Sequence, residues 1–238
     1  MSIGLLVRCS RELLDLELGR DVQRAFALYA EELLAWNERM NLTAITDPEA
    51  IAMRHFLDSL SVKLAVAFSP GMRVIDVGTG AGFPGLPLRL VFPSIELTLL
   101  EATAKKTQFL EHITKRLGLN NVRILNARAE EAGQDPATRE KFDLALARAV
   151  APMPVLAEYL LPFCRVGGRC VALKGEHAAA EVQTAENALR ILGGRLVKII
   201  PVELPLVVET HHLVVIEKVA ATPPQYPRRP GIPSKRPL

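Results

Sequence analysis

The sequence predicts an α/β fold built on a doubly wound, largely parallel sheet with helices on both faces. From Arg73 onward, short apolar runs alternate with amphipathic stretches, a glycine-rich turn follows the first run, and a short loop joins the last two runs. These three observations carry the prediction. Strands are expected at residues 73–77, 95–100, 121–126, 142–147, 169–174, 195–202 and 211–218, and helices at residues 84–92, 104–117, 152–163 and 177–192.

Two helices are expected before the first strand. Between Asp21 and Met40, apolar residues recur at intervals of three and four, the period of an amphipathic helix. A second helix is expected to begin at Asp47-Pro48, where an N-cap aspartate precedes a proline at the first helical position, and to run to about Ala67. We therefore expect residues 1–70 to form an N-terminal helical cap.

The turn after the first strand carries the most informative motif. Gly78, Gly80 and Gly82 lie two residues apart, behind Asp76. Glycine lets a backbone approach a ligand closely, because it has no Cβ. A dinucleotide fingerprint would place its third glycine at position 83, which is Phe83. The spacing matches the acidic-x-G-x-G-x-G pattern of S-adenosylmethionine-dependent methyltransferases, with a glycine-rich turn of another α/β protein as the alternative.

The ends of the next two strands support an adenosyl cofactor. Glu101 follows the second strand about twenty residues after the glycines, where a carboxylate can accept hydrogen bonds from ribose hydroxyls. After the third strand, Ala129-Glu130 is placed to flank the adenine ring. One backbone group and one acceptor there would meet the exocyclic amine of adenine.

The end of the sheet narrows the fold class. The loop from Pro205 to Thr210 is too short for a helical crossover, so the last two strands must pair antiparallel. With the glycine loop, this predicts the Rossmann-like class I S-adenosylmethionine-dependent methyltransferase fold, a seven-stranded sheet with an antiparallel last strand. We expect this domain at residues 71–221. Residues 222–238 are rich in proline and are expected to be an extended, poorly folded tail.

Composition and charge indicate a soluble cytoplasmic protein with a basic tail. No apolar run reaches the roughly twenty residues that span a bilayer, and Met1–Ser10 lacks the basic region of a signal peptide. The three cysteines form no CxxC pair, which favours free thiols in a reducing compartment. The net charge of the chain is +3, yet Arg228, Arg229, Lys235 and Arg236 give the tail +4. This asymmetry favours contact with a polyanion over a purely solubilising tail.

The sequence lacks the residues that two kinds of methyl transfer use, namely methylation of an exocyclic amine and methylation through a cysteine nucleophile. The fourth strand is followed by Arg148-Ala149-Val150-Ala151-Pro152, in place of the Asn/Asp-Pro-Pro-aromatic motif that holds an amino group for methylation. A nucleophilic thiolate is also disfavoured, because Cys164 lies at the end of a predicted helix and Cys170 in a strand, where free cysteine is usually buried.

Metal and triad chemistry find no support. The adjacent His211 and His212 point to opposite faces of a strand, so no metal site is expected. His55, Asp58 and Ser59 resemble a catalytic triad, but no oxyanion feature accompanies them. We expect these three side chains to be surface or packing groups of the second helix.

Basic residues collect after the strands, where open α/β sheets bind ligands. They are Lys105, Lys106, Arg128, Arg148 and Lys174. Several cations at one edge predict a phosphate-bearing substrate such as a nucleic acid. Only 5% of the residues are aromatic, so a single base inserted beside the cofactor fits better than a broad stacking surface.

Longer motifs make the chain resemble the GidB (RsmG) family of bacterial small-subunit rRNA methyltransferases, from about Ala27 to Leu238. These motifs are Trp36-Asn37, Met40–Thr43, His55 with Asp58–Leu60, Asp76–Pro87, Phe109-Leu110, Ala147–Ala151, Leu173–Gly175 and Tyr226–Arg228. The resemblance implies methylation of guanine N7 in the 530 loop of 16S rRNA (guanine 527). The implied substrate is this RNA within the 30S subunit or its precursor, with no membrane and no stable protein partner.

The resemblance also implies roles for individual residues. Together with the glycine loop and the end of the second strand, the expected cofactor-binding residues are Gly78, Gly80, Phe83, Glu101, Ala102, Thr103, Ala129, Glu130 and Arg148. The expected catalytic residues are Arg148 and Lys174, and the expected RNA-binding residues are Lys106, Arg128, Lys174, Arg228 and Arg229. Glu101 stands where the family more often has aspartate, and Ala147 where it has serine.

Two alternative functions remain open from the residues. A small-molecule methyltransferase of the same fold would have no use for the basic rim and tail. A non-catalytic nucleotide-binding protein would bind the cofactor without transferring its methyl group. Labelled methyl transfer to 30S subunits, compared with free metabolites, separates these functions.

Overall fold

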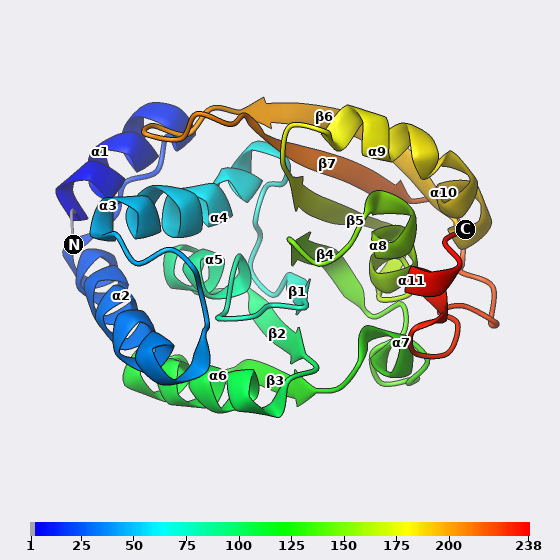
Figure 1. The fold of residues 1–238 in the computed structure, drawn as a ribbon, viewed down its shortest axis with the longest axis horizontal. Coiled ribbons are helices and arrows are strands. Elements are labelled where there is room, and N and C mark those ends of the chain that lie inside the picture. The colour runs from blue at the N-terminus through cyan, green and yellow to red at the C-terminus, as the bar shows by residue number, and fades with distance from the viewer. Residues whose placement is uncertain (1–2) are drawn as a thin grey trace.

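The computed structural model describes residues 3–238, which form one seven-stranded sheet between two layers of helices (Figure 1). The strand order is β3-β2-β1-β4-β5-β7-β6; β1 to β5 run parallel, and β7 pairs antiparallel with β5 and β6. This confirms the predicted class I fold. The strands are β1 (Arg73–Val77), β2 (Glu96–Glu101), β3 (Val122–Asn126), β4 (Phe142–Arg148), β5 (Cys164–Lys174), β6 (Gly194–Val202) and β7 (His211–Lys218).

The connecting helices lie close to their predicted positions, with one break. They are α5 (Gly85–Val91), α6 (Ala104–Arg116), α7 (Ala129–Ala132), α8 (Met153–Leu160), α9 (Ala178–Thr184) and α10 (Glu186–Leu192). The single helix predicted over residues 177–192 is two helices that meet at the fully buried Ala185. The short helix α7 was not predicted.

The N-terminal helices differ more from the prediction. Helix α2 (Arg20–Met40) is confirmed, whereas α1 (Ile3–Leu14) was not predicted. The helix predicted from Asp47 changes type along its length. It consists of α3 (Pro48–Ala50), the π-helix η1 (Ile51–Leu57), α4 (Asp58–Leu60) and the 3₁₀-helix η2 (Ser61–Leu64). Its predicted start is right, because the Asp47 carboxylate accepts from two N–H groups of α3. Irregular π turns of this kind are frequent at functional sites.

Alternate residues of each strand face the two helical layers. In β4, Leu144 and Leu146 belong to the core shared with the N-terminal helices, α5 and α6. Ala145 and Ala147 face the other core, which α8, α9 and α10 cover. Because both faces are buried, the central strands carry continuous apolar runs, such as Leu144–Ala147 of β4.

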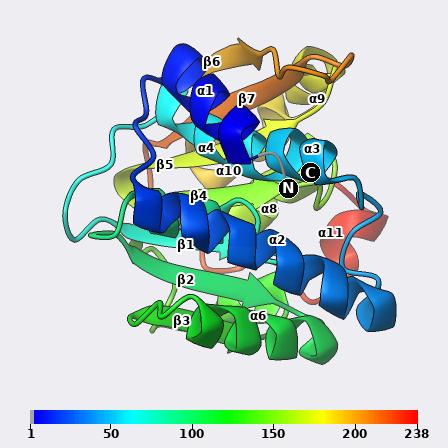
Figure 2. The same ribbon diagram turned by 90° about the vertical axis from the view of Figure 1, so that its left-hand side faces the viewer.

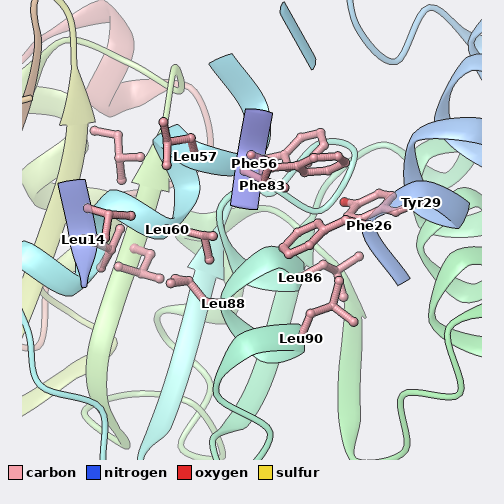
Figure 3. Packing of buried hydrophobic residues seen from close by; sticks show 14 of the residues in the cluster. Leu14, Phe26, Tyr29, Phe56, Leu57, Leu60, Phe83, Leu86, Leu88 and Leu90 are labelled. Atoms are coloured by element: carbon pink, nitrogen blue, oxygen red, sulfur yellow. The ribbon is translucent and has the colours of Figure 1, made fainter. Parts of the chain in front are cut away.

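An aromatic cluster joins the N-terminal helices to the turn after β1. Phe26 and Tyr29 of α2, Phe56 of η1 and Phe83 pack with ring centroids 4.8 to 6.0 Å apart (Figure 3). Figure 2 shows α2 lying across the sheet between α6 on one side and α1 and α3 on the other. The N-terminal helices thus share one core with the sheet and reach the glycine loop directly.

The only tryptophan of the chain lies where α2 meets α6. The ring of Trp36 lies 5.6 Å from that of Phe109 and 4.8 Å from that of His112. One turn earlier in α2, Glu32 accepts from Nε2 of His112 and from Nε of Arg116, both at 2.7 Å. Apolar and ionic contacts therefore hold α2 against α6.

The C-terminal segment is folded, so the expectation of a poorly folded tail is wrong. Residues 222–238 run over α7 and α8 and end with α11 (Ile232–Lys235), drawn in red in Figure 1. Arg139 donates to the carbonyls of Thr222, Pro223 and Tyr226 at 2.7 to 3.2 Å. The prolines stiffen a segment whose backbone acceptors are satisfied by side chains of the domain, which composition alone does not reveal.

Two kinds of feature are absent from residues 3–238. None of the helices there combines the length and the hydropathy that crossing a bilayer requires. Within the same residues, no three His, Cys, Asp or Glu side chains are grouped so that they could hold a metal ion.

Candidate functional site

The glycine loop leaves β1 in a conformation that only glycine adopts freely. Gly78, Gly80 and Gly82 have φ values of +68°, +60° and +99°. Around a Cβ built on Gly80 there is no atom within 4 Å, whereas one on Gly78 would lie 2.8 Å from Val150, in the loop after β4. Gly78 therefore allows two loops to pack closely, and Gly80 lies beside open space.

The carboxylate of Asp76 organises this loop. Its Oδ2 accepts from Oγ1 of Thr79 at 2.6 Å and from the N–H of Gly85 at 2.8 Å. The side chain is fully buried, and its Oδ1 has no hydrogen-bond partner among residues 3–238. Burial raises the pKa of Asp76 to about 6, although the two hydrogen bonds oppose this shift. An unpaired buried carboxylate oxygen fits a site that receives a polar, positively charged ligand.

Glu101 joins the glycine loop to the end of β2. Its Oε2 accepts from the N–H of Gly80 at 3.0 Å, and its Oε1 accepts from the N–H of Thr103 at 2.8 Å. Each carboxylate oxygen keeps a further lone pair for a hydroxyl donor. Open space at Gly80, this carboxylate and the unpaired Oδ1 of Asp76 meet at one edge of the sheet. These residues fit the adenosyl and methionyl parts of S-adenosylmethionine.

The residues after β3 complete this edge. Ala129 and Glu130 open α7, and the Glu130 side chain is buried. Its Oε1 accepts from the N–H of Gly231 at 2.9 Å and from the hydroxyl of Tyr159 at 3.3 Å. The acceptor predicted beside adenine is thus held by the C-terminal segment and by α8.

Arg148, the last residue of β4, lies between the glycine loop and the N-terminal helices. Its Nη1 donates to the carbonyl of Arg54 at 2.8 Å and to Oδ2 of Asp58 at 3.0 Å. Its Nη2 lies 3.2 Å from Nδ1 of His55, and its Cζ lies 4.9 Å above the ring of Phe83. The guanidinium is therefore fixed in position before any substrate binds.

The surroundings of His55 determine its protonation. Burial and the neighbouring Arg148 guanidinium lower the pKa of His55 to about 3, so its ring is neutral near pH 7. Because Nδ1 faces a guanidinium donor, the ring proton is assigned to Nε2, which lies 2.8 Å from Oγ1 of Thr43. The ring also stacks on Phe83 at 4.6 Å. His55 thus positions both Arg148 and the glycine loop.

Asp58 and His211 extend the network across the chain. Oδ1 of Asp58 lies 2.8 Å from Nδ1 of His211 at the start of β7, while its Oδ2 binds Arg148. The prediction that His55 and Asp58 are ordinary packing groups missed this network. The sequence pattern R-H-x-x-D over residues 54–58 offered a weak signal of a polar site. The partners of His55 and Asp58 are about 90 to 150 residues away along the chain.

Lys174, the last residue of β5, is almost enclosed. Its Nζ donates to the carbonyl of Ala151 at 2.9 Å and pairs with Oε2 of Glu181 at 2.6 Å. The same Glu181 oxygen accepts from the N–H of Met153 at 3.0 Å. Lys174 therefore holds the loop after β4 in place, in addition to lining a cavity.

A cavity of about 340 Å³ opens beside these side chains. Its walls include Arg54, His55, Asp58, Arg148, Lys174, Glu181 and His211. A larger cavity, of about 680 Å³, lies at the opposite edge, where Arg73, Glu96, Val122 and Phe142 begin the parallel strands. Open α/β sheets bind ligands at the carboxyl ends of their strands, so we assign the smaller cavity to the site.

The predicted RNA-binding residues fall into different environments. Arg128 and Arg229 are exposed, and Lys106 is half-buried. Arg228 instead forms an ion pair with Glu158, whose side chain is fully buried, at 2.7 Å. The sequence could not indicate this pairing, because 70 residues separate the two partners.

The fold and this site define the class of the protein, a class I S-adenosylmethionine-dependent methyltransferase. The class is indicated by the strand order, by the loop of three glycines behind Asp76 and by Glu101 at the end of β2. More particularly, the chain belongs to the GidB family, rRNA small subunit methyltransferase G, whose family model matches residues 22–211. This membership confirms the predicted family, enzyme class and cofactor.

Individual relatives agree with this assignment. The chain is 49% identical over 210 residues to the "Ribosomal RNA small subunit methyltransferase G" of Alkaliphilus metalliredigens, covering 88% of both chains. It is 43% identical over 234 residues to the protein of the same name from Desulfitobacterium hafniense, covering 98% of this chain and 97% of the relative. The crystal structure of TrmN from Thermus thermophilus matches with a TM-score of 0.52 at 23% identity, over 71% of this chain and 53% of that chain. This last likeness shows the fold.

Proposed function

We propose that this protein methylates N7 of a guanine in bacterial 16S rRNA, guanine 527 of the 530 loop, with S-adenosylmethionine as the donor. The observation that carries the proposal is the cavity next to Arg148, because this guanidinium also lies over Phe83 of the glycine loop. A base inserted there would lie next to the cofactor site. The names of the curated relatives support the choice of small-subunit rRNA.

The proposed reaction needs positioning more than proton transfer. Bound S-adenosylmethionine supplies an electrophilic methyl group on a positively charged sulfur. Guanine N7 offers an in-plane lone pair and carries no proton, so the protein has no proton to remove. Catalysis then rests on in-line placement and on exclusion of water from the reacting atoms. No thiolate is required, which agrees with the burial of all three cysteines, Cys9, Cys164 and Cys170, and with a raised pKa of Cys170, caused chiefly by burial.

The chain's own residues divide this work. Arg148 and Lys174 line the cavity and orient the base or its neighbouring phosphate, while His55, Asp58 and Glu181 hold those two cations in place. A guanidinium cannot stabilise the positive charge that develops on the base, so its role is orientation.

Contacts to RNA and cofactor follow the predicted assignment. For RNA we propose Lys106, Arg128, Lys174 and Arg229; the assignment of Arg228 remains a prediction, and its guanidinium is engaged by Glu158. For the cofactor we propose Gly78, Gly80, Phe83, Glu101, Ala102, Thr103, Ala129, Glu130 and Arg148. The proposed division of the chain is a helical cap at 1–70, the methyltransferase domain at 71–221 and a C-terminal segment at 222–238. The reaction is proposed to occur in the cytoplasm on the 30S subunit or its precursor, with no stable protein partner.

Methyl transfer to defined substrates tests the proposal. Purified protein and labelled S-adenosylmethionine are incubated with 30S subunits from a strain that lacks the modification, with protein-free 16S rRNA and with free guanine nucleotides. We expect 7-methylguanosine in the 530 loop, mapped by mass spectrometry, and little product with Arg148→Ala. The exposed Arg190→Ala is the matched control. Label on another atom, or transfer to free nucleotides alone, would contradict the proposal.

A further inference from the structure

One ion pair anchors the C-terminal segment to the domain. The N–H of Arg228 donates to Oε1 of Glu158 at 2.7 Å, and its guanidinium donates to both carboxylate oxygens at 2.7 to 3.2 Å. The Glu158 side chain is fully buried in α8. A buried carboxylate is costly without a partner, so this bidentate pair ties the segment firmly to α8.

Further bonds bring the segment to the helix that follows β3. Nε2 of Gln134 donates to the carbonyls of Pro224 and Pro227 at 3.2 and 2.9 Å. A Cβ on Gly133 would lie 2.8 Å from the Pro227 ring, so the segment packs directly against the end of α7. Figure 1 shows α11 beside α7 and α8.

The segment then reaches a residue assigned to the cofactor site. The N–H of Gly231 donates to Oε1 of Glu130, and the hydroxyl of Tyr159 lies 3.2 Å from Oγ of Ser234 and 3.3 Å from the same carboxylate oxygen. Burial is the main cause of the raised pKa of Tyr159, so its hydroxyl keeps its proton for donation.

We infer that residues 222–238, the C-terminal strap, position Glu130 and so determine affinity for the adenine half of the cofactor. Arg228 and Tyr159 are positioning residues in this arrangement. The inference rests on the proposed function, because it assigns Glu130 to the adenine of S-adenosylmethionine. It gives this segment a role in addition to the contact with a polyanion that its charge predicts.

The strap acts through the order of α7. A helix of four residues is unstable by itself and must be held by its surroundings. Two donors fix Oε1 of Glu130, and the opposite oxygen, Oε2, makes no hydrogen bond among residues 3–238. That second oxygen can accept from the exocyclic amine of adenine. Without the strap, α7 and the Glu130 carboxylate lose their fixed position, and the affinity for the cofactor falls.

Two arginines of the strap give a matched comparison. Arg228→Ala removes the anchor, whereas Arg236→Ala removes an equal charge from an exposed position. We expect Arg228→Ala to weaken binding of S-adenosylhomocysteine about tenfold by calorimetry. Arg236→Ala should change it less than about twofold. Tyr159→Phe, which keeps the ring and loses one donor to Glu130, should weaken it about threefold.

A second ligand shows whether weaker binding comes from misplacement of Glu130 or from a general loss of structure. S-inosylhomocysteine carries a carbonyl where adenine has its amine. The unmodified protein should prefer S-adenosylhomocysteine over it by about tenfold, and this preference should shrink in Arg228→Ala and in Tyr159→Phe. If Arg228→Ala does not fold, Tyr159→Phe decides the question.

The outcomes distinguish the two proposals. Suppose that the unmodified protein binds S-adenosylhomocysteine, and that Tyr159→Phe and a folded Arg228→Ala bind both ligands with the same affinities as the unmodified protein. The strap inference is then wrong, and the proposed function stands. If the unmodified protein binds neither ligand, the proposed function itself fails. An unchanged preference with uniformly weaker binding would also overturn the role of Glu130.

Discussion

Arg148 at the end of β4 and Asp58 of the N-terminal helices form an ion pair at 3.0 Å, with the carboxylate almost fully buried. The pair connects two parts of the chain that meet only through tertiary packing. It also brings Asp58 between Arg148 and His211, and so between β4 and β7. The candidate base cavity therefore depends on the N-terminal helices as much as on the sheet.

A double-mutant cycle measures this dependence. Asp58→Ala should lower the free energy of unfolding by about 3–5 kcal/mol, because it leaves a largely buried guanidinium without its carboxylate. Adding Arg148→Ala should cost less than the sum of the two single changes, with a coupling of about 1–3 kcal/mol by urea unfolding. Additive changes would show that the ion pair contributes nothing.

Gly80→Ala should abolish cofactor binding without unfolding the protein. Gly118→Ala is the matched control, because both residues have φ near +60° and open space around a built Cβ. Each change costs about 1–2 kcal/mol of backbone strain. Only the methyl group at position 80 points into the space assigned to S-adenosylmethionine. Calorimetry on both variants checks this, and equal retention of binding would place the cofactor elsewhere.

His55 should make the fold sensitive to acid. Its pKa is about 3 in the folded protein, against an ordinary value of 6.5. Between these values the unfolded chain binds the additional proton, so the contribution of His55 to stability is full above pH 6.5 and is lost as pH falls toward 3. His55→Gln should therefore show a smaller fall in unfolding free energy from pH 6.5 to pH 4.

The control for this prediction is His177→Gln, at an exposed position. The contribution of Asp76 to stability changes with pH in the opposite direction to that of His55. Its pKa is raised to about 6, so its stabilisation is lost as pH rises from 3.8 to 6. That contribution is present in both variants, so it cancels in the comparison. Equal pH slopes in the two variants would show that His55 titrates normally.

Cys164→Ala and Cys170→Ala should each leave methyl transfer largely intact. Both thiols are fully buried on the sheet face covered by α8 to α10, away from the glycine loop. The expected cost is about 1–2 kcal/mol of stability from the small cavity. Turnover is measured on 30S subunits, with thermal unfolding as the check on folding. Loss of turnover in a folded variant, or a covalent adduct with RNA, would overturn the proposed chemistry.

The sheet could be predicted from the sequence because each strand carries its own local pattern. The predicted start of β1 and the antiparallel pairing of β7 depend on apolar runs and on the length of one loop. Helix breaks were harder to predict. The change to a π-helix at Ile51 and the break at Ala185 have no glycine or proline to mark them. Helix α1 did carry a signal, since Leu6, Cys9 and Leu14 are spaced for one buried face.

The site was predictable where it is local and not where it joins distant residues. The glycine loop and Glu101 follow from spacing along the chain, and the structure brings them within hydrogen-bond distance. The partners of Arg148 and Arg228 depend on tertiary packing across about 70 to 94 residues. A basic residue in a proline-rich segment looks solvated in sequence, and only the fold shows the buried carboxylate that it meets.

The position of Trp36 provides a built-in optical probe. Its indole is the only one in the chain and lies against Phe109 and the imidazole of His112, across the contact between α2 and α6. Its emission therefore reports whether the N-terminal helices are seated on the sheet. The C-terminal strap contains no tryptophan and contacts other helices, α7 and α8. Fluorescence can thus follow detachment of the N-terminal helices, while calorimetry on variants of the strap follows ligand binding.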